Sequence, residues 1–287
     1  MNTVFYKRHL HTEVTGKQLN DTGEKFYKFL DEYMNDDNFK YTLGEQTVDN
    51  FVPSYMFPCS EKAMHFTTFD TIFRRNYNNI KLCEIQISDD SKCYIEHNRI
   101  KADKITIVKI THICSLDWWN DIDICLKAVK QNGNILFYVK EQTEEICLEA
   151  VKQNGDALKH VKEQTEEICL EAVKNCDALK HVKKQTEEIC LEAIKRHPFS
   201  LYDVKKQTNK ICLEAVKRCG YMLNGVNEQT DEICLEAVKR DKHALEFVKK
   251  QTHKICLEAV KYDGYSLEFV EHKFRTDEIC MEAIIMT

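Results

Sequence analysis

The chain has 287 residues, a net charge of −6, and apolar and charged fractions of 43% and 31%, which are typical of a folded soluble protein. This length allows two ordinary domains. The small negative charge gives nucleic-acid binding no electrostatic support, and no apolar run approaches the ~18 residues of a membrane span. The first residues lack the apolar core of a signal peptide. We therefore expect a soluble intracellular protein that binds neither nucleic acid nor membrane.

Residues 1–112 contain no internal repeat and predict a small α+β domain. Their apolar pattern predicts four strands, at residues 4–7, 81–87, 93–96 and 104–108. Two helices are expected, at residues 21–34 and 68–77, the first because its aromatic and leucine residues fall on one helical face.

Histidines raise the question of an active site in this domain, which contains His9, His11, His65 and His97. The stretch His65-Phe66-Thr67-Thr68, followed by a predicted helix and strand, resembles mono-ADP-ribosyltransferase folds, which bind a nicotinamide dinucleotide in a cleft of the sheet. The arginine, Ser-Thr-Ser and acidic set of that family is not matched, and the chain has no phosphate loop, HExxH or GxSxG motif. The sequence therefore predicts no catalytic residue, no cofactor and no metal ligand.

Residues 113–122 form a junction, in which Trp118 and Trp119 are expected to join the first domain to the C-terminal repeats. From residue 123 to residue 287 the chain repeats a unit of about 22 residues roughly seven and a half times. One cysteine marks each copy, at Cys125, Cys147, Cys169, Cys190, Cys212, Cys234, Cys256 and Cys280. A period of this length is typical of a stacked array.

Each unit predicts two short helices. Thr143 is expected to cap the first helix, whose acidic first turn suits the helix dipole. Isoleucine, cysteine, leucine, alanine and valine of that helix are expected in the core. Gly155 is expected to end this helix and Asp156 to cap the second one. Helices this short are marginal alone, so neighbouring copies must stack. The predicted fold is an α+β N-terminal domain followed by an all-α solenoid of short two-helix repeats.

Three repeated polar or sulfur positions receive structural interpretations. The cysteines are expected to be reduced and buried, because copies ~10 Å apart exceed the ~7 Å between Cα atoms that a disulfide allows. Metal-binding spacings such as C-x-x-C are absent. The repeated glutamate, Glu149 in one copy, is interpreted as a solvated position with a lysine partner. The repeated glutamine is expected to bind neighbouring turns.

Positions that differ between copies are the candidate binding surface. Two columns follow the glycine of each unit, and the partner-binding candidates in them are Phe199, Tyr202, Tyr221, His243, Tyr265, Lys159 and Lys180. Aromatic side chains are favoured anchors of protein interfaces. The alternative is that these rings only cover the ends of the short helices, and the sequence does not decide between the two.

The last copy contains one predicted helix, residues 277–286, which ends in the apolar residues Ile284, Ile285 and Met286. Because a terminal repeat normally has a polar outer face, these residues predict a homodimer that forms through this helix. The alternative is that the helix folds back against the preceding repeat and buries them.

The repeat E-I-C-L-E-A-V-K-x-x-G-x-A-L-x-x-V-K-x-Q-T over residues 122–287 is similar to an uncharacterised helical-repeat family of giant DNA viruses of amoebae. The segments at residues 65–68 and 100–105 resemble the N-terminal leader domain that these viruses attach to several repeat types, ankyrin arrays included. The resemblance implies a viral protein made in the host cytoplasm and leaves its presence in the virion open. The sequence favours a scaffold that binds a host or viral protein along the solenoid. The alternative is an enzyme in the N-terminal domain, with the repeats recruiting its substrate.

Overall fold

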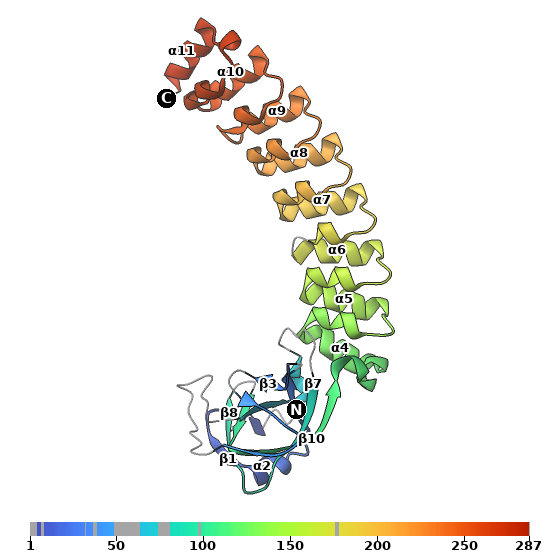
Figure 1. Cartoon of the computed structure of the whole chain (residues 1–287). Helices are drawn as coiled ribbons and strands as arrows, with labels where there is room; N and C mark the ends of the chain where they lie inside the picture. The colour runs from blue at the N-terminus through green and yellow to red at the C-terminus, as the bar shows by residue number, and fades with distance from the viewer. Residues whose placement is uncertain are drawn as a thin grey trace. The chain divides into compact units, whose positions relative to one another are not determined.

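The computed structural model describes residues 5–6, 9–31, 33–36, 39–48, 64–73, 81–96, 99–175 and 178–286. The chain divides into two compact units, residues 1–149 and 150–287, and Figure 1 shows the sheet of the first and the stacked helices of the second. Among the described residues, no helix has the length and apolar character that crossing a membrane requires.

The first unit contains an antiparallel sheet with the strand order β1-β8-β9-β6-β2-β7-β10-β5. Its strands are β1 (Glu13–Thr15), β2 (Phe26–Leu30), β5 (Gly44–Thr47), β6 (Met64–Thr68), β7 (Lys81–Gln86), β8 (Lys92–Glu96), β9 (Arg99–Ala102) and β10 (Lys104–His112). Two further strands pair with each other, β3 (Asn35–Asp36) and β4 (Phe39–Lys40). Two short helices accompany the sheet, α2 (Gly16–Asn20) and α3 (Phe69–Ile72).

The predicted strands at 81–87, 93–96 and 104–108 are confirmed as β7, β8 and β10, but the helix predicted at 21–34 is wrong. Most of that segment's apolar residues form β2, which lies between β6 and β7 in the sheet and is buried on both faces. A strand buried on both faces has no period-two alternation, so its apolar residues, interrupted only by Lys28, also fit one face of a helix.

Two other predictions at the N-terminal end are corrected in part. Phe5 and Tyr6 are helical rather than extended, while the rest of the predicted strand 4–7 lies outside the described residues. The helix predicted at 68–77 is short: Thr68 ends β6, α3 stops at Ile72, and residues 74–77 lie outside the described part of the chain.

Trp118 and Trp119 lie where the sheet meets the first repeat, within the first unit. The Trp119 ring is buried, donates its Nε1 hydrogen bond to the Ile113 carbonyl at 2.6 Å, and stacks on Tyr138 at 5.7 Å between ring centroids. Trp118 contacts the edges of Tyr27 and Phe69. These aromatic contacts bury apolar area from β2, α3 and the first repeat in one cluster.

Each repeat before the last consists of an α-helix followed by a 3₁₀-helix. In the first unit these are α4 (Ile122–Gln131) and η3 (Gly133–Tyr138), preceded by η1 (Ile113–Ser115) and η2 (Asp117–Asn120), and α5 (Glu144–Gln153) then spans the division between the units. The α-helices of the second unit are α6 (Glu166–Asn175), α7 (Glu187–Arg196), α8 (Asn209–Arg218), α9 (Asp231–Val238), α10 (His253–Tyr262) and α11 (Asp277–Ile285). Its 3₁₀-helices are η4 (Gly155–His160), η5 (Leu179–His181), η6 (Pro198–Asp203), η7 (Gly220–Gly225), η8 (Ala244–Phe247), η9 (Gly264–Phe269) and η10 (His272–Phe274).

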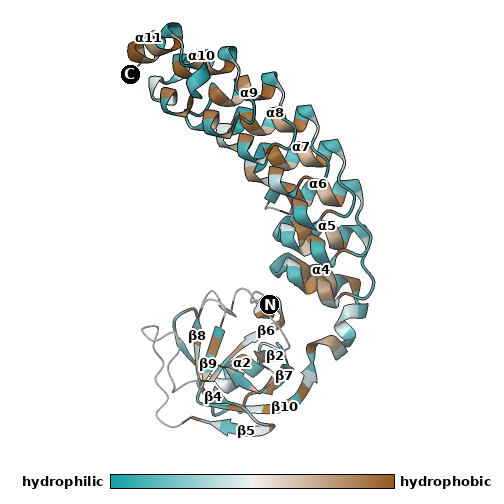
Figure 2. Ribbon diagram, turned by 45° about the horizontal axis from the view of Figure 1, so that its top comes forward, coloured by the Kyte–Doolittle hydropathy of each residue, from teal (hydrophilic) through white to brown (hydrophobic). Residues whose placement is uncertain are grey.

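The first helices form as predicted. A threonine caps each helix from α7 to α11; for example, the Thr186 hydroxyl accepts a hydrogen bond from the Ile189 amide at 3.3 Å. Asp121 caps α4 in the same way. Isoleucine, cysteine, alanine and valine are buried in successive copies. Figure 2 shows both hydrophilic and hydrophobic residues along α6 to α10, as expected for helices with one exposed and one buried face.

The repeated glycine has a different role from the predicted one. Helix α5 ends at Gln153, the Asn154 side chain accepts a hydrogen bond from the Asp156 amide at 3.1 Å, and Gly155 begins the 3₁₀-helix. The residue is therefore not a left-handed helix terminator. At Gly220, a Cβ atom would lie only 2.6 Å from the Ala237 carbonyl oxygen in the next repeat. At that copy the glycine permits close stacking of neighbouring repeats.

The leucine of the first helix is also misassigned by the sequence. Leu170 and Leu191 are half-buried, unlike the fully buried leucines of the 3₁₀-helices, such as Leu158 and Leu201. Both half-buried leucines lie at the margin of the apolar stripe, where they line a surface groove.

Candidate functional site

The stack is held rigidly by its repeated glutamines, as the sequence predicted. The Gln207 side chain donates to the Gly225 carbonyl at 2.8 Å and accepts from the Asn227 amide at 2.9 Å, both in the next repeat. Gln185, Gln229 and Gln251 make the same pair of bonds across their own boundaries. Side chains displayed on this framework therefore sit at fixed separations.

Lysines add a second link between repeats. The Lys205 ammonium donates to the carbonyls of Val182 and Lys183, at 3.0 and 3.1 Å, in the preceding copy. Lys249 makes the equivalent contacts with Val226 and Asn227. These lysines are structural, so they are not free to bind a partner through their charge.

The cysteine column carries no reactive site. Its members from Cys125 to Cys256 are free thiols and buried, and Cys280 is half-buried. Burial raises the pKa of Cys234 and of Cys256 to about 11, so both thiols stay protonated near neutral pH. Among the described residues no group of three or more histidine, cysteine, aspartate or glutamate side chains could hold a metal ion.

On the outer surface of α6 to α10, here called the first-helix face, one repeated glutamate is paired with a cation in most copies. Glu171 contacts Lys174 at 2.9 Å, and Glu214 contacts Arg218 at 2.7 Å, each within one helix. The repeats at Glu192 and Glu236 follow the same pattern with Arg196 and Arg240. The prediction of a local cationic partner is confirmed, but these glutamates are half-buried rather than fully solvated.

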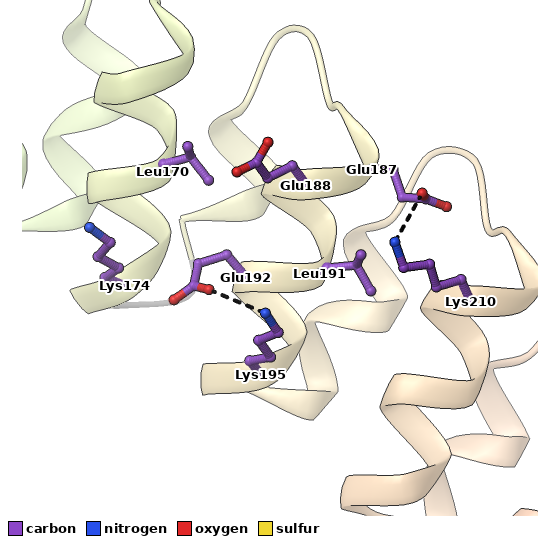
Figure 3. A pocket seen from close by; sticks show the side chains of 8 residues that line it. All are labelled: Leu170, Lys174, Glu187, Glu188, Leu191, Glu192, Lys195 and Lys210. Atoms are coloured by element: carbon purple, nitrogen blue, oxygen red, sulfur yellow. Dashed lines mark ion pairs between the residues drawn. The ribbon is translucent and has the colours of Figure 1, made fainter.

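A groove of about 520 Å³ lies on this face, along α6, α7 and the start of α8. Figure 3 shows its lining, which is Leu170, Lys174, Glu187, Glu188, Leu191, Glu192, Lys195 and Lys210. Glu187 accepts a hydrogen bond from the Thr208 hydroxyl, which with Lys210 holds the pKa of its carboxyl below the usual range. Three lysines and three glutamates balance one another, so the groove does not select an ion of either sign.

A second surface, which carries exposed aromatic rings, is formed by the exposed side chains of η4 to η9 and is here called the 3₁₀ face. The face also includes His243, which directly precedes η8. All seven predicted partner-binding residues belong to it and all are exposed: Phe199, Tyr202, Tyr221, His243, Tyr265, Lys159 and Lys180. Phe199 and Tyr202 expose 58% and 54% of their surface. Large exposed rings in a row are unusual on a folded surface and mark a candidate interaction site.

Contacts between neighbouring 3₁₀-helices fix several of these rings. Tyr221 packs edge-on against Phe247 at 5.1 Å between centroids, and His243 packs against Phe269 at 5.6 Å. The Tyr202 ring lies against Gly225, where an added Cβ would come within 2.9 Å of it. The rings therefore cover neighbouring turns on one side and face solvent on the other, which combines the two alternatives left open by the sequence.

Two acidic residues of the same face were missed as site candidates. Glu246 and Glu268 are exposed and occupy the column that holds Lys159 and Lys180 in earlier copies. The sequence could have revealed them, because a comparison of copies shows lysine at one end of that column and glutamate at the other. Candidates chosen for aromatic character include only the middle of the column.

Helix α11 exposes its apolar residues. Ile284 and Ile285 are 69% and 70% exposed, and Met286 is also exposed. The alternative in which this helix folds back and buries them is therefore wrong for the described structure.

The segments at residues 65–68 and 100–105 of the N-terminal domain contain paired strands. His65 and Phe66 in β6 lie opposite Lys101 and Ile100 in β9. Lys101 is fully buried and forms an ion pair with Glu96 at 2.5 Å. The Lys28 ammonium donates a hydrogen bond to the His65 carbonyl at 2.7 Å. Buried lysines with such partners are accounted for by the fold itself.

Residues 112–143, 165–209 and 209–251 match a family model described as Domain of unknown function (DUF4116). No curated protein and no solved structure matches the chain significantly. The matched segments contain α4 and α6 to α9 with the 3₁₀-helices that follow them. The repeats of this chain are thus similar to a domain family to which no function is assigned.

Proposed function

We propose that this chain is a protein-interaction scaffold, which binds a protein partner along the 3₁₀ face. The observation that carries the proposal is the row of exposed rings, Phe199, Tyr202, Tyr221 and Tyr265, at positions that differ between copies. The residues that hold the array together recur from copy to copy. The exposed residues that differ between copies are therefore not needed for stacking. A partner that covers these rings removes apolar area from water, which is the main source of binding free energy.

Pre-organisation supports the same proposal. A side chain immobilised on binding costs ~0.5–1.5 kcal/mol of entropy. Tyr221 and His243 are already held by rings of the next repeat, and Tyr202 by its contact with Gly225. Binding a partner therefore costs less side-chain entropy at these rings, which suits them to act as anchors.

Two finer parts of the proposal rest on other observations. The resemblance of the repeats and of segments 65–68 and 100–105 to giant-virus proteins supports a role in the cytoplasm of an infected host, with a host or viral protein as partner. The exposure of Ile284 and Ile285 supports a separate contact, a homodimer through α11.

Affinity capture with the tagged full chain tests the scaffold role. A variant with Phe199, Tyr202 and Tyr221 each replaced by serine removes the anchors, and we expect recovered partners to fall by on the order of tenfold or more. The matched control replaces Glu167, Glu188 and Glu232 by serine, three exposed residues of the first-helix face. Equal recovery from both variants and the unmodified chain contradicts the proposal, provided that circular dichroism shows all three equally folded.

A further inference from the structure

The 3₁₀ face carries a charge pattern that runs from basic to acidic along the array. One column of exposed residues, taken from η4 to η9 in order, reads Lys159, Lys180, Tyr202, Asn224, Glu246 and Glu268. Two cations therefore lie at one end, two carboxylates at the other, and an uncharged pair in the middle.

These charges are unsatisfied by the fold. Among the described residues, neither Lys159 nor Lys180 forms an ion pair or a hydrogen bond through its ammonium, and neither Glu246 nor Glu268 accepts one at its carboxylate. By contrast, the repeated glutamate of the first-helix face, Glu171 in one copy, contacts a lysine or arginine of its own helix. An exposed charge with no internal partner is free to select an external one.

The column is complementary to itself under one two-fold rotation. An axis through the midpoint between η6 and η7 brings Lys159 of one chain opposite Glu268 of another, and Lys180 opposite Glu246. Tyr202 then faces Asn224, and in the neighbouring column Phe199 faces Tyr221. A parallel arrangement instead places lysine on lysine and glutamate on glutamate, which is repulsive.

The resulting contact has the anatomy of a stable interface. Phe199, Tyr202 and Tyr221 occupy its centre, and the charged residues form its rim. With repeats ~10 Å apart, η4 to η9 span ~50 Å, so a strip ~16 Å wide reaches the ~800 Å² per partner of a standard interface. The rings supply affinity, whereas exposed ion pairs contribute little energy each and fix the orientation.

We propose that the 3₁₀ face binds a second copy of this chain, antiparallel and across η4 to η9. This inference rests on the proposed function, because it names the partner of the same face. Two-fold dimers are the commonest oligomers, and a two-fold contact requires one self-complementary patch. The lysine-to-glutamate column is such a patch, and it gives the dimer a defined register.

Sedimentation velocity of the full chain across a concentration series tests the dimer. The unmodified chain is expected to dimerise at low salt and more weakly at high salt. The double variant Lys159→Glu, Lys180→Glu makes both ends acidic, and Glu246→Lys, Glu268→Lys makes both ends basic. Each variant alone is expected to weaken dimerisation by on the order of 100-fold. The control Lys184→Glu, Lys206→Glu makes the same change in net charge at exposed lysines outside the column and is expected to leave the dimer intact.

Mixing tests whether opposite charges across the contact restore the dimer that each double variant loses. An equimolar mixture of the all-acidic and all-basic variants is expected to form the heterodimer, and a chain that carries all four reversals is expected to form the homodimer again. A mixture that stays monomeric contradicts the antiparallel register. An unmodified chain that is monomeric at every concentration contradicts the proposal that a second copy binds this face. If that monomer still captures a protein through its rings, the scaffold role stands and only this inference fails.

Discussion

The repeated cysteine shows how a single side chain is fixed by packing. In each copy from Cys147 to Cys256 the thiol lies on the buried face, with its Sγ directed at the glutamine five residues earlier, 3.6 Å away at Cys212. The sequence predicted this burial correctly, because the residue recurs on the apolar stripe. It could not reveal the sulfur contact, because the glutamine's orientation is set by the next repeat.

Thiol reactivity should separate the column from the exposed Cys114. A thiol reagent needs the thiolate and access to it, and burial denies access to the column and raises the pKa of thiols such as Cys169 and Cys234. We expect Cys114 to react quickly in the native protein and the column only in denaturant. Mass spectrometry of the labelled peptides reads each site, and rapid native labelling of Cys147, Cys169 and Cys190 would contradict the structure.

The same shift predicts a loss of stability in alkali. The pKa of Cys234 is raised from an ordinary value of 9.0 to about 11 in the folded state. The stabilisation is therefore fully present below pH ~9 and is lost as the pH rises through about 11, because only the unfolded state releases the proton easily. Urea unfolding of Cys234→Ala should show a shallower decline over this window than the unmodified chain. An identical decline would mean that this thiol's ionisation does not couple to folding.

Leucines in the two helices of a repeat should differ in their contribution to stability. Leu158 is fully buried in η4, so Leu158→Ala should cost ~2–5 kcal/mol. Leu170 in α6 is half-buried, so Leu170→Ala should cost less, ~1 kcal/mol, although the repeat sequence places both in the core. Denaturant unfolding of the matched pair measures the difference. Equal costs would show that the groove margin packs like the core.

At the scale of elements, the first helices were predictable because their signals are local. Thr186 caps α7, acidic residues fill its first turn, and the apolar spacing is helical. The 3₁₀-helices were predicted only as short helices, because their tight turns depend on the close approach of the next repeat. The strand β2 was missed for a related reason: its neighbours β6 and β7, far away in sequence, decide that Phe26–Leu30 is extended.

The candidate site was predicted in part. The rings at Phe199, Tyr202 and Tyr221 stand out because the copies differ there, and the structure places them on one exposed face. Their packing on Gly225 and Phe247 in following repeats could not be read from one chain's periodicity. The opposed charges of Lys159 and Glu268 become meaningful only once the 3₁₀-helices are known to lie side by side.

The glutamine link between repeats should be energetically important. In Gln207→Leu, the Gly225 carbonyl and the Asn227 amide each lose a partner. The Gly225 carbonyl is only partly buried and the Asn227 amide is exposed, so each lost bond should cost about its net value of ~0.5–1.5 kcal/mol, and we expect ~1–3 kcal/mol in total. Lys206→Leu, one residue earlier and exposed, is the control and should be nearly neutral. Hydrogen exchange should increase mainly in the two repeats that Gln207 joins, and uniform loosening of distant repeats would contradict a nearest-neighbour array.

At the scale of the whole molecule, two apolar surfaces compete as association sites. One is the 3₁₀ face, and the other is α11, which is largely hydrophobic in Figure 2 and exposes Ile284 and Ile285. Their predicted salt dependences differ. The 3₁₀ face combines rings with unpaired charges and should associate less at high salt, whereas burial of α11 is apolar and should be insensitive to salt or strengthened by it.

Ile285→Lys tests the contact through α11. A two-fold contact places this side chain near its own copy, so the substitution removes apolar area and adds like charges at once. If α11 forms the dimer, light scattering should show a monomer for Ile285→Lys at concentrations where the unmodified chain is dimeric. The side chain is exposed, so the unfolding midpoint should barely change, which separates lost association from lost folding. A dimer that survives Ile285→Lys but is abolished by Lys159→Glu, Lys180→Glu would assign association to the 3₁₀ face and reject the α11 contact.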